Sequence, residues 1–224
     1  MDSEQQGAVP GHPLSHKNQV LNTVAGMTQA YEPIKNICGH LNAFHVYADE
    51  PSRAVEANHY CASLNEDVRQ CLIYDSSEKN ARLIGVEYMI SPELYETLEP
   101  AERRLWHSHV FEIKSGMLIM PRPLLVPAAA WNIAEMKEME EVIQLYGKIY
   151  NMWQVDRGDK LPIGEAKLMT SVTEEGEGLV PGLWEKVAER DRKFVADYKE
   201  KREARKEMVE PKIHPDADQC KKRP

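Results

Sequence analysis

The feature that most constrains the fold is a run of short secondary-structure signals between residues 69 and 116. Two β-prone segments, 70–74 and 82–90, flank a polar turn over 76–80, which predicts a hairpin. Ser91, Pro92 and Glu93 then predict a helix start, with the helix reaching about residue 105 and a strand following over 107–116. The order strand, strand, helix, strand predicts an α+β fold with a small, mostly antiparallel sheet flanked by helices.

Apolar residues at three- and four-residue steps predict helices elsewhere in the chain. Ile34, Ile37, Leu41 and Phe44 form such a stripe, so a helix is expected to open near Pro33. Further helices are expected over 52–67 and 132–153, and a last strand over 168–172. Beyond residue 182 a long charged C-terminal helix is expected, whose opposite charges nearly cancel. That pattern is typical of a surface arm or docking element, and it makes this helix the expected contact of a homo-oligomer.

These signals divide the chain into four parts. Residues 1–25 are expected to be a flexible N-terminal lead-in, and residues 26–175 an α+β domain. Residues 176–210 are expected to form a loop and the charged C-terminal helix, and residues 211–224 a loose tail.

Composition excludes several classes of protein. The net charge of −8 argues against a general nucleic-acid binder, which needs a basic face. No run of about 18 apolar residues and no secretory signal is present, so no transmembrane segment is expected and a cytoplasmic location is predicted. The four cysteines are widely spaced without a Cys-x-x-Cys pair, which predicts reduced thiols and no thiolate zinc site.

The stretch Trp106-His107-Ser108-His109 has the most specific chemistry. In a strand, His107 and His109 point to the same face and could bind one metal ion together. His59 or His40 from a helix would complete a nitrogen shell for zinc, iron or copper.

Glu112 is a conditional ligand in this hypothesis, with Asp67 as the alternative carboxylate. Glu112 follows His107 by five residues, an odd step that turns it to the opposite face of a regular strand unless a bulge intervenes. The stretch superficially resembles the first cupin motif, in which that step is even. The competing interpretation is structural: the histidines bond to the adjoining turn, and Glu112 pairs with Lys114 or an arginine.

Several blocks of the chain, taken in order, are shared with a known family. They include Asn58-His59-Tyr60-Cys61, Gln70-Cys71-Leu72-Ile73-Tyr74-Asp75, Leu105-Trp106-His107-Ser108-His109 and Trp153-Gln154-Val155-Asp156-Arg157-Gly158. Over roughly residues 26–172 the chain resembles the oil body-associated protein family, long catalogued as a domain of unknown function.

The resemblance implies a peripheral role at lipid droplets, without established catalysis. The implied partners are a droplet surface or a droplet protein, and the implied location is lipid-droplet-associated. The alternative function is a small metal-dependent enzyme acting on a hydrophobic metabolite. Tyr74, Tyr88 and Trp106 would line its pocket.

Overall fold

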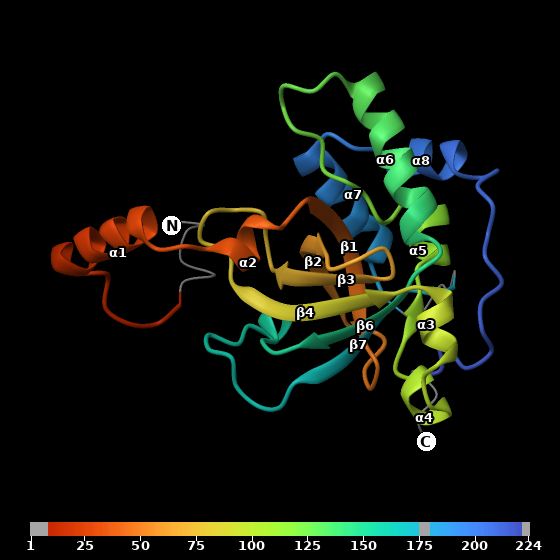
Figure 1. Ribbon diagram of the computed structural model, residues 1–224, viewed down its shortest axis with the longest axis horizontal. Helices are drawn as coiled ribbons and strands as arrows, with labels where there is room; N and C mark the ends of the chain where they lie inside the picture. Colours follow the sequence, from red (N-terminus) through yellow and green to blue (C-terminus); the bar gives the residue numbers. More distant parts are fainter. Residues whose placement is uncertain (1–8, 175–179, 221–224) are drawn as a thin grey trace.

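A closed antiparallel β-barrel forms the centre of the computed structural model, which describes residues 9–174 and 180–220 (Figure 1). Within these residues six strands form a closed ring in the order β1-β2-β3-β4-β6-β7, and β7 pairs back with β1. A short seventh strand, β5, pairs with the first residues of β6. The strands are β1 (Gly39–Tyr47), β2 (Ala54–Ser63), β3 (Val68–Tyr74), β4 (Leu83–Ile90), β5 (His107–Ser108), β6 (Tyr146–Asn151) and β7 (Lys167–Ser171).

Helices cover parts of the barrel (Figure 1). Leu41 and Ala43 of β1 pack against α5 and α6, while Phe44 and Val46 on the other face of the same strand pack against α7. Figure 1 shows α6, α7 and α8 together at one side of the barrel and α1 well away from them. The helices are α1 (His16–Thr28), α2 (Glu32–Lys35), α3 (Pro92–Glu96), α4 (Pro100–Arg103), α5 (Val110–Lys114), α6 (Ala128–Val142), the 3-10 helix η2 (Val155–Arg157), α7 (Leu183–Phe194) and α8 (Tyr198–Ala204). None of the helices in the described ranges has the length and apolarity that a bilayer span requires.

The predicted α+β sheet flanked by helices is wrong, because the sheet closes on itself. The hairpin of β3 and β4 and the strand β7 are confirmed, but the helices expected near Pro33 and over 52–67 are largely the strands β1 and β2. β1 is buried on both faces, with Leu41 packed against α5 and α6 and Phe44 under α7. A strand buried on both faces loses its polar–apolar alternation, so its apolar residues can match a helical period by chance.

The predicted long C-terminal helix is also wrong, because the chain turns between α7 and α8. Val195 adopts a left-handed conformation with φ of 53°, which ends α7, and the Asp197 side chain then caps α8. Leu183 and Val187 of α7 are buried against the barrel. The apolar side of this segment is therefore used within the chain, and nothing supports its use in oligomerisation.

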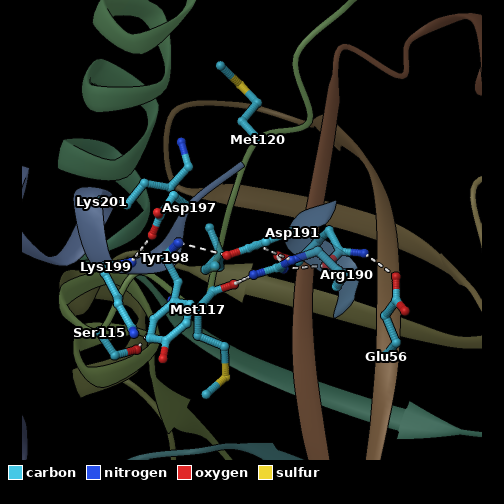
Figure 2. Close-up of polar contacts among 12 residues, drawn as sticks. Glu56, Ser115, Met117, Met120, Arg190, Asp191, Asp197, Tyr198, Lys199 and Lys201 are labelled. Carbon is cyan, nitrogen blue, oxygen red and sulfur yellow. Dashed lines mark hydrogen bonds and ion pairs between the residues drawn. The ribbon is translucent and has the colours of Figure 1, made fainter. Parts of the chain in front are cut away.

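Arg190 fastens α7 to the barrel (Figure 2). Its guanidinium donates to the backbone and side-chain oxygens of Asn42, at 3.1 and 2.5 Å, and to the carbonyl of Met117 at 2.7 Å. Asp191 accepts from Arg190 and from the backbone N–H of Tyr198, which links α7 to the start of α8.

Cys61 and Cys71 form a disulfide across β2 and β3, where they are register partners. The expectation of four reduced thiols is therefore wrong for this pair. Spacing along the sequence could not reveal the bond, because the hairpin register brings the two residues together.

Candidate metal centre

Four histidines and two glutamates meet inside the barrel, and we call this group the His–Glu cluster. Each of the six residues is 0–1% exposed. They come from β1, β2, β4, β5 and the first turn of α5, so the group exists only once the barrel has closed. The members are His45, His59, Glu87, His107, His109 and Glu112.

The Glu87 carboxylate lies at the centre of the cluster. Its Oε2 is 3.0 Å from Nε2 of His59, and its Oε1 is 3.2 Å from Nε2 of His107. Nε2 of His109 is 3.6 Å from the same Oε1. The His45 ring completes the group, with its centroid 4.9 Å from that of His59 and 5.8 Å from that of His107.

Strand alternation and one glycine create this arrangement. His45, His59 and Glu87 lie at inward positions of β1, β2 and β4, as does Gly147 of β6. A Cβ atom at Gly147 would lie 2.8 Å from Nε2 of His107 and 2.9 Å from Cε1 of His109. Glycine is therefore needed at this strand position to leave room for the imidazoles.

His109 is held in one orientation by the backbone. Its Nδ1 is 2.8 Å from the carbonyl of Leu145, so Nδ1–H donates this bond and Nε2 faces Glu87 and Glu112. The hydroxyl of Ser171 donates to Oε2 of Glu112 at 2.9 Å. A histidine with one nitrogen bonded to a carbonyl and the other directed at a polar site is the usual arrangement of a metal ligand.

Burial and mutual proximity shift the pKa values of several side chains in the His–Glu cluster. Burial alone would raise the pKa of Glu87, but the imidazole nitrogens of His107, His109 and His59, at 3.0–3.6 Å from its oxygens, hold that pKa well below its usual range. Burial alone would lower the pKa of His109, yet Glu87 and the charge of Glu112 raise it to about 9. Burial lowers the pKa of His45 well below its ordinary value and raises the pKa of Glu112. Perturbed pKa values of this kind concentrate at functional sites.

Many polar atoms of the cluster lack an aligned hydrogen bond to any described residue. Buried polar atoms of this kind are costly and call for an explanation, such as a bound ion. One donor atom each from His45, Glu87 and His107 lie within 4.8 Å of one another, which is compatible with a shared ion. The atoms are Nδ1 of His45, both ring nitrogens of His59 and His107, both oxygens of Glu87, Nε2 of His109 and Oε1 of Glu112.

The structure brings most of the predicted ligands together, though by a different route. His59, His107 and His109 converge. His59 lies in the strand β2 rather than in the predicted helix, and of the His107–His109 pair only His107 lies in a strand, because the chain turns into α5 directly after His109. In that turn Glu112 follows His109 by three residues and lies on the same side, with Oε1 3.9 Å from Nε2 of His109. Neither a regular strand nor a bulge is involved.

The other predicted site residues lie elsewhere. His40 is five residues from His45 on β1, so its side chain lies on the opposite face of the strand. There it stacks on Tyr60 and contacts Asn58. The predicted pocket aromatics do not share a cavity: Trp106 is buried with Tyr146, whereas Tyr88 is exposed on the barrel surface and Tyr74 contacts Tyr60. Asp67 lies in the exposed β2–β3 turn.

Sequence reasoning missed His45 and Glu87. His45 directly follows the apolar stripe that predicted a helix, and Glu87 lies in the second strand of the predicted hairpin. The available signal was the acidic side chain of Glu87 within the apolar strand 83–90, since a buried strand rarely carries an unpaired charge.

The chain resembles characterised sequences over nearly its whole length. It is 45% identical to oil body-associated protein 1A of Zea mays, over 94% of this chain and 85% of that protein. It is 41% identical to oil body-associated protein 1B of Arabidopsis thaliana (93% and 83%) and 42% identical to the 2A protein of that plant (79% and 69%). No solved structure matches it. The family model "Protein of unknown function (DUF1264)" matches residues 31–209, and the chain therefore belongs to the oil body-associated protein family.

Proposed function

We propose that the His–Glu cluster binds one divalent transition-metal ion and that metal binding is the function of the barrel interior. The observation that carries this proposal is the set of buried nitrogen and oxygen atoms that face one another without aligned hydrogen bonds. A cation would accept one lone pair from each side chain that binds it, whereas without it the barrel must bury these atoms at a cost.

The donor types narrow the choice of ion. Imidazole nitrogens with a carboxylate oxygen suit zinc, iron or copper, while calcium and magnesium prefer oxygen ligands alone. His45, Glu87 and His107 are the first candidates for direct ligands, because their donor atoms lie closest together as a group. His59 and His109 stand next to Glu87 and would either join the shell or orient it.

The enclosure of the site favours binding over catalysis on a large substrate. The cavity beside His45, bordered also by Ile73, Gly85 and Met169, measures about 10 Å³, which holds about one water molecule. A hydrophobic metabolite would need far more room than this cavity provides.

Metal analysis of the full chain tests this proposal. The protein is unfolded in chelator, refolded with Zn²⁺, Fe²⁺ or Cu²⁺, desalted and measured by elemental analysis, with circular dichroism as the check on folding. We expect about one ion per chain for the wild type and less than about a tenth of that for Glu87→Gln, which preserves the shape of the side chain.

His40→Gln is the matched control, because His40 lies outside the cluster and should leave the metal content unchanged. A folded wild-type protein that retains no metal would refute the proposal. So would a Glu87→Gln variant with full metal content.

We also propose a peripheral role at the surface of oil bodies. The names of the relatives favour this second function, which is independent of the barrel interior. A fluorescently tagged copy in lipid-loaded cells should concentrate on droplets, and a diffuse signal would count against the role.

A further inference from the structure

Helix α1 carries an apolar face that nothing in the described chain covers. Val20, Leu21, Val24 and Met27 are 49–83% exposed, and the helix contains no buried residue. At 3.6 residues per turn, these four side chains fall within about one third of the helix circumference. Figure 1 shows α1 apart from the barrel, so the face is presented to the surroundings.

The rest of α1 is polar but almost uncharged. Asn18, Gln19, Asn22 and Thr23 occupy the opposite side, and no Asp or Glu lies within residues 16–28. Lys17, the one Lys or Arg of the helix, lies in the first turn on the same side as Val20, Leu21 and Val24, so its long side chain would extend toward the headgroups. The net charge of the whole chain is −8, so this absence of acidic residues is a local feature. Such a helix would meet neither strong repulsion nor strong attraction at a phospholipid surface, and apolar insertion would dominate its binding.

A second copy of the chain is a weaker candidate for covering this face. The helix has 13 residues, less than two heptads, whereas a paired-helix seam is sustained over about three to four heptads. A lipid monolayer accepts a short apolar face without requiring complementary shape.

We propose that α1 is the lipid-contacting element of this protein and lies in the phospholipid monolayer of an oil body, with Val20, Leu21, Val24 and Met27 inserted. This inference rests on the proposed oil-body role and names the part of the chain responsible. The barrel makes no lipid contact in this proposal, so metal binding and lipid binding are separate properties of the molecule.

Flotation with artificial droplets tests the inference. The full chain is mixed with triolein droplets coated with phosphatidylcholine, and the floating fraction is compared with the fraction left in solution. Leu21→Ser combined with Val24→Ser removes two apolar side chains, so we expect the partition to fall about tenfold or more. Leu124→Ser combined with Leu125→Ser is the matched control, because both leucines are more than 90% exposed in a loop away from α1, and its partition should equal that of the wild type.

The outcomes separate the two proposals. A wild-type chain that does not float overturns the oil-body role and this inference together. If the wild type floats and the α1 variant floats equally, or if only the loop variant is lost, α1 is not the contact and the oil-body role stands. Light scattering of the free proteins adds a further test: a dimeric wild type with a monomeric α1 variant would show that a second copy covers the face, which also overturns the inference.

Discussion

At the scale of single residues, the size of one side chain decides whether the His–Glu cluster can form. Gly147 stands opposite His107 in the pairing of β5 with β6, and the cluster occupies the space where a side chain would begin. The neighbours are buried imidazoles and a carboxylate, which have no open space to move into.

Gly147→Ala should therefore destabilise the fold. Overpacking of a buried site costs about 1–3 kcal/mol, and we expect a fall of that size in the free energy of unfolding measured with urea. Gly39→Ala is the control, because its Cβ would meet only Cβ of Cys61 at an ordinary 4.0 Å. Equal stability of the two variants would show that the cluster has room to relax.

His40 should make the stability of the fold depend on pH. Burial is the main cause that lowers its pKa, the charges of His59 and Lys193 act in the same direction, and a hydrogen bond with Asn58 opposes them. A histidine with a lowered folded pKa binds protons more readily in the unfolded chain. The free energy of unfolding is therefore highest above the pKa that His40 has in the unfolded chain. It decreases as the pH falls below that pKa and through the pKa that His40 has in the folded protein.

We therefore expect the wild type to lose more stability than His40→Gln when the pH falls from about 7.5 to about 5. Urea unfolding of both proteins at the two pH values measures this difference. The other buried histidines are present in both proteins, so the comparison removes only the titration of His40 and its coupling to His59. A pH dependence identical in both would show that His40 is not responsible.

At the scale of elements, α7 is held by directional bonds as well as by apolar packing. Arg190 satisfies carbonyl groups of two separate segments, at Asn42 and Met117, which a single N–H donor could not do (Figure 2). The planar guanidinium offers several donors in a fixed geometry, and an ammonium group does not.

Arg190→Lys should thus destabilise the protein by about 1–3 kcal/mol, because buried acceptors lose their donors. Arg192→Lys makes the same change on the exposed side of the same helix and should alter stability by less than about 0.5 kcal/mol. Thermal and urea unfolding measure both, and similar values for the two variants would contradict the role given to Arg190.

Local elements could be predicted from the sequence, whereas long-range strand pairing could not. The β3–β4 hairpin was predictable because a polar turn separates two β-prone runs. Local spacing paired His107 with His109, but the approach of His59 depends on tertiary contact that spacing cannot supply. The closure of the barrel was not predictable, since it depends on the long-range pairing of β1 with β7 and of β4 with β6. Because Glu87 reaches the cluster only through that closure, the central residue of the site was missed.

At the scale of the whole molecule, the barrel is stabilised by a covalent bond beside its site. Cys71 is the register partner of Glu87, and its disulfide to Cys61 joins β2 to β3.

Replacing both cysteines by serine should lower the free energy of unfolding by about 3 kcal/mol, as expected for a closed loop of this length. Cys38→Ser, at an exposed thiol outside the bond, should have little effect. Mass spectrometry after alkylation with and without reductant reports the bond itself, and four cysteines that all react without reductant would contradict it.

Asp218, close to the C-terminal end of the described chain, holds the middle of the histidine pair. Its carboxylate accepts from both the backbone N–H and the hydroxyl of Ser108, and its backbone N–H donates to the carbonyl of Trp106. During synthesis on a ribosome, His107 and His109 emerge more than a hundred residues before this partner does. The nascent chain therefore cannot form the hydrogen bonds that hold the His107–His109 segment until Asp218 has been synthesised. An ion that bound earlier would meet a site that lacks these contacts.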